Sequence, residues 1–221
     1  MKHGGYKLNA LRPGLPPLPA QMRRLHIDDR GYPVPWFVAW VNGQPEFRVA
    51  DMGKMFRARR FGYCWICGSN VGKVRTFCIG PMCAVNRVTS EPPCHTECAQ
   101  FAVMACPFLT LPQAKRRDAN LPADISDPAG MMIDRNPGVT CLWTTNRFRL
   151  FDVGNGHLYR IGDPSHVAFY KEKRLASRAE VLASIDSGMP ILRRLAEEDG
   201  VRAVVALESE YCKVLPLLPA A

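Results

Sequence analysis

Two pairs of potential metal ligands lie close together in this 221-residue chain. Cys64 and Cys67 form a Cys-x-x-Cys motif, and His95 and Cys98 form a His-x-x-Cys motif after 27 intervening residues. A Cys-x-x-Cys turn directs two thiolates at one point, and a His-x-x-Cys pair at the start of a helix places two further ligands on one face. The spacing therefore predicts a tetrahedral Cys₃His zinc site. Reduced, buried cysteines with a chance Cys-x-x-Cys spacing are the alternative interpretation.

Seven of the nine cysteines fall within one 43-residue window, which favours a metal site over a disulfide framework in a chain without a recognisable secretory signal. The other members of this window, Cys78, Cys83, Cys94 and Cys106, would suffice for a second tetrahedral zinc. We expect a single zinc, because Cys106 would lie about 16 Å along a helix from His95 and Cys78 falls within an apolar strand. Cys83, which follows a Gly-Pro turn, is the reserve ligand.

Catalytic interpretations fit the motifs less well. His95 and Glu97 match the His-x-Glu of zinc deaminases, but no Pro-Cys-x-x-Cys follows them. A Cys₃His set is coordinatively closed, and the Cys-x-x-Cys pair lacks the βαβ surroundings of a thioredoxin-like redox site. We therefore expect a non-enzymatic protein. The alternative is a metal-dependent enzyme acting on nucleic acid, nuclease or deaminase-like, with Glu97, Asp51 or His157 recruited by folding.

The net charge of +9 is concentrated in the first half of the chain. Residues 1–60 hold 11 Lys/Arg against 4 Asp/Glu, whereas residues 121–221 hold 12 against 13. A basic half beside a neutral half predicts contact with a polyanion, either nucleic acid or an acidic host protein. A merely solvated basic surface is the alternative. The candidate contacts are Lys54, Arg57, Arg59, Arg60, Lys73, Arg75 and Arg87.

Aromatic residues accompany this basic segment. They are Trp36, Trp40, Tyr63 and Trp65. Such side chains can stack on the bases of single strands, although Trp36 and Trp40 suit packing within a hairpin better. No uninterrupted apolar segment reaches the roughly 18 residues of a membrane span, so we expect a cytoplasmic protein without a membrane partner.

Composition divides the chain into four segments. Residues 1–20 hold four prolines and three glycines and are expected to form a flexible arm that orders only on a partner or against the body. We expect a basic β-hairpin plus the zinc-binding module over 21–110, a linker or long loop over 111–137, and a β-meander plus C-terminal helices over 138–221. The predicted fold class is α+β: small antiparallel β elements around a zinc-stapled treble-clef-like module, with a helical C-terminal tail.

Local signals place the elements of the first half. Asn42-Gly43 separates two aromatic and β-branched runs between residues 36 and 49, which predicts a hairpin with a type I′ turn. Asp51 is expected to cap a basic helix from Met52 to about Arg60. Further expected elements are a strand over 74–78 and a helix over 94–105.

The second half combines strands with helices. The expected elements are strands over 139–143, 148–151 and 158–161 and a short helix over 163–170. Ser177 and Glu180 form a capping box that starts a longer helix. Gly188 is expected to end this helix, and further helices begin at Pro190 and Val201.

Three segments carry a resemblance: CIGPMCAVNR at 78–87, SEPPCH at 90–95 and CPFL at 106–109. They are similar to an uncharacterised family of hypothetical proteins in bacteriophages and GC-rich bacteria, and the similarity covers most of the chain. The resemblance implies a phage or prophage accessory protein that engages nucleic acid or host machinery. The resemblance assigns no catalytic residue to this chain.

Overall fold

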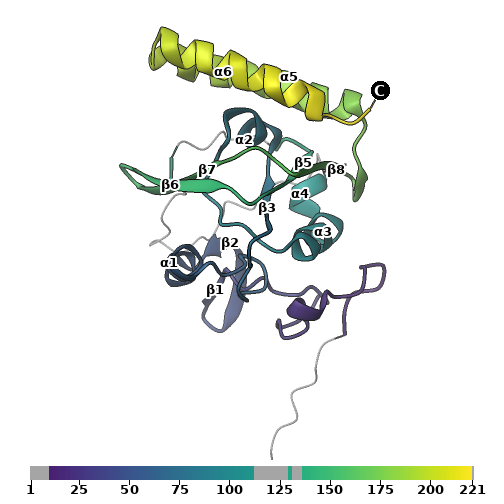
Figure 1. The fold of residues 1–221 in the computed structure, drawn as a ribbon. Helices are drawn as coiled ribbons and strands as arrows, with labels where there is room; N and C mark the ends of the chain where they lie inside the picture. The colour runs from purple at the N-terminus through teal and green to yellow at the C-terminus, as the bar shows by residue number, and fades with distance from the viewer. Residues whose placement is uncertain (1–9, 112–128, 131–135, 221) are drawn as a thin grey trace, which may run out of the picture.

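The computed structural model describes residues 10–111, 129–130 and 136–220, which leaves most of the predicted linker outside the described residues. The chain has an α+β fold with antiparallel sheets (Figure 1). The strands are β1 (Val38–Val41), β2 (Gln44–Ala50), β3 (Arg75–Ile79), β4 (Val88–Thr89), β5 (Thr140–Thr145), β6 (Phe148–Val153), β7 (Gly156–Ile161), β8 (His166–Lys171) and β9 (Arg174–Leu175). The helices are α1 (Met52–Phe61), α2 (Pro81–Asn86), α3 (Thr96–Ala105), α4 (Pro107–Thr110), α5 (Arg178–Glu198) and α6 (Val201–Val214), with short 3₁₀ turns η1 (Ala20–Met22) and η2 (Leu215–Leu217). None of the helices in the described ranges is long and apolar enough to cross a membrane.

The central sheet carries its strands in the order β3-β5-β8-β9, all antiparallel. Because side chains alternate between the two faces of a sheet, the register partners Phe77 and Trp143 enter one core and Leu142 enters another. A second sheet has the order β4-β7-β6, and β1 pairs with β2. The segments 21–110 and 138–221 therefore contribute strands to the same central sheet.

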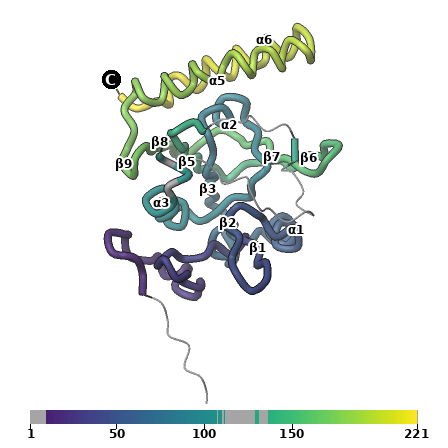
Figure 2. Tube along the Cα trace, turned by 180° about the vertical axis from the view of Figure 1, so that it is seen from behind, coloured from purple at the N-terminus to yellow at the C-terminus, as the bar shows by residue number. Residues whose placement is uncertain are grey.

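The larger core lies between the central sheet, the β6–β7 hairpin and the helices α2, α5 and α6. Phe77, Trp143 and Tyr159 are its largest fully buried side chains, and Phe148 makes edge contacts with Phe77 and Tyr159. Helices α5 and α6 pack against each other and cover α2, as Figure 1 and the reverse view in Figure 2 show. The C-terminal helices thus form a layer at the end of the molecule opposite the N-terminal segment.

The smaller core surrounds the cysteine cluster on the other face of the central sheet. Phe101 of α3 is among its buried side chains, and Leu11 and Leu18 from the N-terminal segment pack against it. Residues 10–20 of the predicted arm therefore lie against the body of the protein. Residues 1–9 lie outside the described residues.

The predicted hairpin and helix of the first half are confirmed. Asn42 and Gly43 have φ values of 51° and 76°, the left-handed conformation that a type I′ turn requires. Asp51 caps α1 by accepting a hydrogen bond from a backbone N–H in the first helical turn. Gly62 ends α1 with a φ of 66°, where glycine carries no Cβ penalty. The hairpin and α1 share an apolar cluster with Trp65, which brings this basic helix beside the cysteine cluster.

The predicted helix over 163–170 is wrong, because residues 166–171 form β8 between β5 and β9. Val167 and Phe169 pack into the larger core, whereas Tyr170 packs against the smaller one, and this alternation between two faces is the period of a strand. The expected meander is also wrong in part. β6 and β7 form the predicted hairpin, but β5 pairs with β3 and β8 instead.

Helix α5 continues through the positions where the sequence predicts an end. Gly188 and Pro190 lie inside it, and the helix runs on to Glu198. Met189 and Leu192 are buried in the larger core on either side of the proline. Tertiary packing of this apolar face outweighs the low helix propensity of glycine and proline.

Candidate metal centre and the adjoining basic cleft

The first two sulfur atoms come from a tight turn that follows α1. Gly68 N donates to Cys64 O at 2.8 Å, and Cys64 N donates to Ser69 O at 2.6 Å. The Cys67 N–H donates to the Cys64 sulfur at 3.4 Å. Glycine is required at position 68, because its φ is +72° and a Cβ would lie 2.5 Å from the Trp36 ring. The backbone therefore directs both thiols to one point.

The second pair comes from the start of α3. Thr76 in β3 and Cys94 pair through two backbone hydrogen bonds of 2.9 and 2.8 Å, and this pairing places His95 at the N-cap of α3. Cys98 lies three residues later in the first helical turn, on the same side of the helix. The His95 N–H donates to the Cys64 sulfur at 3.4 Å. The two halves of the cluster are thus joined directly.

The four side chains converge in a compact cluster. Their ligand atoms all lie within 4.8 Å of one another. His95 Nδ1 is 3.4 Å from Cys67 Sγ and 3.8 Å from Cys98 Sγ, while His95 Nε2 lies 3.0 Å from Asn70 O. A backbone acceptor on Nε2 leaves Nδ1 as the nitrogen that faces the sulfurs. The cluster has the donors to hold a metal ion, and its members are the four residues that the sequence spacing singles out as ligands.

The three thiols of the cluster alter one another's protonation. The pKa of Cys67 lies far below its usual range because the thiols of Cys64 and Cys98 hydrogen-bond to its sulfur. The pKa of Cys98 is raised by its contacts with the same two sulfurs and by burial. All three side chains are fully buried, so a charged thiolate cluster needs a cation beside it. A metal ion would displace the thiol protons and take the place of these hydrogen bonds.

Cys83, the predicted reserve ligand, lies apart from this cluster. It sits on α2 against the larger core, where burial raises the pKa of its thiol to about 11, and it is not among the side chains that converge in the cluster. Burial also raises the pKa of Cys78 and Cys94, and the Cys94 thiol donates to Thr76 O. Among the described residues, Cys78, Cys83, Cys94 and Cys106 do not gather into a second group of ligands.

Two of the seven cations predicted to face a partner are engaged inside the protein. Arg87 is 4% exposed, lies 4.3 Å from the centre of the Trp143 ring and pairs with Glu210 at 3.5 Å. The ammonium of Lys54 is largely buried and donates to Val38 O at 2.8 Å. Neither can reach a polyanion without breaking these contacts. Both are therefore corrections to the predicted partner surface.

The other five cations lie on α1 and on the chain between the cysteine turn and β3. They are Arg57, Arg59, Arg60, Lys73 and Arg75. Arg59 and Arg75 are half-buried and line one cleft together, although they come from separate elements. The remaining three are exposed, and the guanidinium of Arg57 lies 5.5 Å from the Trp36 ring centre. Folding thus brings Arg59 and Arg75, which come from two stretches of sequence, to one cleft near the cysteine cluster.

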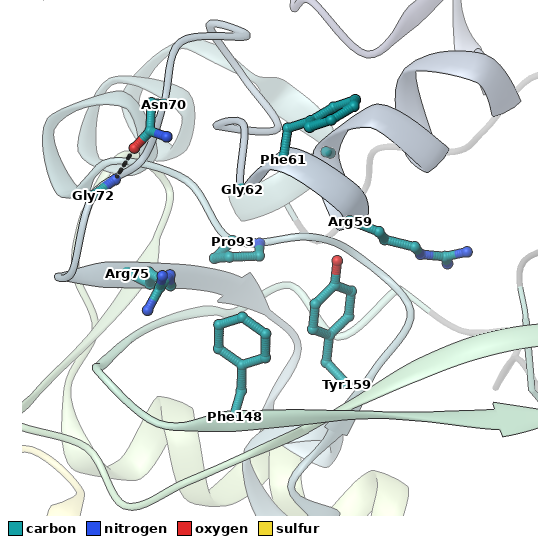
Figure 3. Close-up of a pocket in the computed structure, with 10 residues that line it drawn as sticks. Arg59, Phe61, Gly62, Asn70, Gly72, Arg75, Pro93, Phe148 and Tyr159 are labelled. Carbon is teal, nitrogen blue, oxygen red and sulfur yellow. Dashed lines mark hydrogen bonds between the residues drawn. The ribbon is translucent and has the colours of Figure 1, made fainter.

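The cleft has a volume of about 320 Å³ and is drawn in Figure 3. Arg59 and Phe61 reach it from α1, Arg75 from the start of β3, and Phe148 and Tyr159 from the β6–β7 hairpin. Among the residues that the structure describes, no carboxylate side chain lines it. Sequence reasoning missed Phe148 and Tyr159, because no local motif marks them and their position depends on the pairing of β7 with β4.

The aromatic residues predicted for stacking divide into buried and accessible ones. Trp65 is buried and stacks on Phe37 with ring centres 4.8 Å apart, so it is a correction to the predicted stacking set. Trp36 is half-buried against the cysteine turn and meets Tyr63 edge-on. Trp40 is 46% exposed on the hairpin. None of these four residues is among the side chains that line the cleft.

The candidate catalytic residues have separate roles. Glu97 is exposed and accepts a hydrogen bond from Gln21. Asp51 caps α1, and His157 pairs with Asp152 at 2.7 Å near the β6–β7 turn. Within the described parts of the chain, none of the three joins the Cys₃His cluster.

Comparison of the chain with models of protein families, with curated proteins and with solved structures found no match. The residues and their geometry are therefore the basis for assigning a function.

Proposed function

We propose that this protein is a zinc-stabilised, non-enzymatic module that binds nucleic acid. The observation that carries the proposal is the position of the basic cleft beside the Cys₃His cluster. Asn70 lines the cleft with Arg59 and Arg75, and its carbonyl contacts the candidate ligand His95 at 3.0 Å. A metal in the cluster would hold in place the loop beside these cations. In this proposal zinc stabilises the fold and the adjoining surface binds.

Zinc suits the donor set of the cluster. Three thiolates and one imidazole are a common tetrahedral set for structural zinc. Backbone N–H groups of Cys67 and His95 already point at the Cys64 sulfur, and such bonds stabilise a thiolate. The cysteine turn, the Thr76–Cys94 strand pair and helix α3 also follow one another in the order of a treble clef, which supports a zinc-stapled module.

Nucleic acid suits the basic surface better than an acidic protein does. Phosphates need cations that are not already paired, and none of the described residues that line the cleft with Arg59 and Arg75 is a carboxylate. Aromatic rings stand in the same cleft, and they can stack on bases. An acidic host protein would use the same cations, so it is the outcome to expect if nucleic acid fails to bind.

A binding role is favoured over catalysis because four protein ligands fill the tetrahedral shell of zinc. No position then remains for the water that a zinc hydrolase or deaminase activates. The resemblance to bacteriophage proteins is compatible with an accessory protein acting in the cytoplasm of a host cell. It adds no residue to the site.

The test is the salt dependence of nucleic-acid binding. Affinity for short random-sequence strands should fall linearly with log salt, by about 0.7–0.9 per phosphate contacted. Neutralising Arg57 and Arg60 together with glutamine should make this slope shallower by about two contacts. The matched control replaces Arg194 and Arg202, which are exposed on α5 and α6.

Elemental analysis of each protein accompanies the titration. We expect about one zinc per chain in the wild type and in both double variants. Salt-independent binding, or no binding of any strand at low salt, would contradict the nucleic-acid role. Substoichiometric zinc in freshly purified protein would contradict the structural role of the metal.

A further inference from the structure

The cleft beside the metal centre has the dimensions of a small-molecule site. Its volume of about 320 Å³ falls at the lower end of the roughly 300–1,000 Å³ of ligand pockets. Gly62 and Gly72 stand on its wall, and a Cβ at either position would meet no atom within 4 Å. Phe61 is 52% exposed. The cleft is therefore open to solvent at one side and walled by aromatic side chains at another (Figure 3).

The polar groups of the cleft are cationic and only partly satisfied. Arg59 Nη2 donates to His157 O at 3.1 Å, but its buried Nε has no hydrogen-bond partner among the described residues. The guanidinium of Arg75 lies 5.2 Å from the centre of the Phe148 ring. Tyr159 also lines the cleft (Figure 3), but it is 1% exposed, so the accessible aromatic surface is that of Phe61. The site thus offers positive charge and hydrogen-bond donors beside π faces.

This combination matches one ligand chemistry. A phosphate would satisfy guanidinium donors, and a planar base would cover exposed aromatic surface. Inorganic phosphate would leave the aromatic wall unused, and an acidic peptide would present no flat ring to it. A nucleotide unit uses both halves of the site.

We propose that the cleft accepts one unpaired base of a single strand, with adjoining phosphates contacted by Arg59 and Arg75 on opposite sides of the cleft (Figure 3). This inference rests on the proposed nucleic-acid function and narrows it to single strands. In a duplex both faces of a base are covered by its neighbours in the stack, so a paired base cannot enter without being extruded. Phe61 at the edge of the cleft provides a stacking surface for the base.

The experiment compares three labelled probes by fluorescence anisotropy: a single-stranded oligothymidylate, a duplex of equal length and an abasic single strand of equal length. The abasic strand carries the phosphates without the bases. We expect the wild-type protein to bind the oligothymidylate on the order of tenfold more tightly than either of the other probes.

Single-residue variants distinguish binding of the base from electrostatic attraction to the phosphates. Phe61→Ala should lose on the order of tenfold in affinity for oligothymidylate and little for the abasic strand. Phe56→Ala is the matched control, because Phe56 is 65% exposed on the same helix but does not line the cleft. Arg75→Gln should weaken binding of both single strands more than Arg60→Gln does. Circular dichroism and zinc content show that each variant keeps its fold.

Each outcome decides between the two proposals. Equal affinity for the three probes, or equal effects of Phe61→Ala and Phe56→Ala, would overturn the base site and leave the nucleic-acid function standing on phosphate contacts. No binding of any probe at low salt would overturn both. Tighter binding of oligothymidylate that is lost in Phe61→Ala and kept in Phe56→Ala would support the base site.

Discussion

Arg87 connects helix α6 to the central sheet. We predict that its ion pair with Glu210 contributes more to the free energy of unfolding than the exposed ion pairs do. Its guanidinium lies against the Trp143 ring, and its Nε is 3.5 Å from Glu210 Oε2 on α6. Asp163 also lies 3.4 Å from Nη1, but the Asp163 side chain is 94% exposed. Glu210→Gln keeps the shape of the side chain and removes the charge that faces the buried cation.

The distance sets the scale of the effect. Unit charges separated by 3.5 Å attract by about 5 kcal/mol at an effective dielectric constant of about 20. Removing one partner of a buried pair costs about 3–5 kcal/mol, but Glu210 keeps 20% of its side-chain exposure, which screens part of the interaction. We therefore expect Glu210→Gln to lower the free energy of unfolding by about 2–4 kcal/mol. Asp163→Asn should lower it by less than about 0.5 kcal/mol, because an exposed charge is already solvated.

Glu208→Gln is the matched control for urea unfolding followed by circular dichroism. Glu208 is also on α6 and binds one arginine, Arg193 of α5, through two contacts of 2.6 and 3.2 Å. Both side chains of that pair are at least 40% exposed, so its loss should cost under about 1 kcal/mol. If Glu210→Gln is no more destabilising than Glu208→Gln, the buried position of Arg87 does not determine the strength of the pair and the reasoning fails.

Three other perturbations test the centre and the helix cap. Cys98→Ser, or chelation of the metal, is expected to lower the unfolding temperature and hydrogen-exchange protection in α3, and unchanged protection would contradict a structural metal. Gly68→Ala is expected to lower the free energy of unfolding by at least about 1–2 kcal/mol, since the added Cβ meets the Trp36 ring at 2.5 Å in a left-handed conformation; wild-type urea stability would refute this. The pKa of Glu180 lies well below its usual 4.5, first because Arg174 hydrogen-bonds to it, so its stabilisation is complete above about pH 4.5 and is lost as the pH falls. Glu180→Gln should flatten that acid limb of the stability curve, and an unchanged limb would count against the assignment.

The elements that the sequence predicts correctly are those whose conformation depends on residues close to them in the chain. Asn42-Gly43 forms the hairpin turn because both residues tolerate a positive φ, and Asp51 caps α1 through a backbone N–H in its first turn. The two ligand pairs are predictable for the same reason. A Cys-x-x-Cys turn and the first turn of a helix each set two side chains at a short distance, whatever the rest of the fold does.

Sequence reasoning failed where the deciding partner is distant. The strand at 166–171 resembles a helix locally, but pairing with β5 and burial of Phe169 decide its conformation. Arg87 looks like a surface cation in a basic segment, and only the fold brings Trp143 and Glu210 to it. Composition therefore overestimated the cationic surface available to a partner, because it counts charges without their burial.

The structure relates the metal centre to the cleft through one short loop. Asn70 accepts from the candidate ligand His95 through its carbonyl, and its side-chain oxygen accepts from Gly72 N at 2.9 Å. Asn70 and Gly72 both line the cleft, and Arg75 follows at the start of β3. The next residue, Thr76, pairs with Cys94 beside the same histidine. One wall of the cleft is therefore held at both ends by contacts with the Cys₃His cluster, so a metal ion bound in this cluster would also fix the position of that wall.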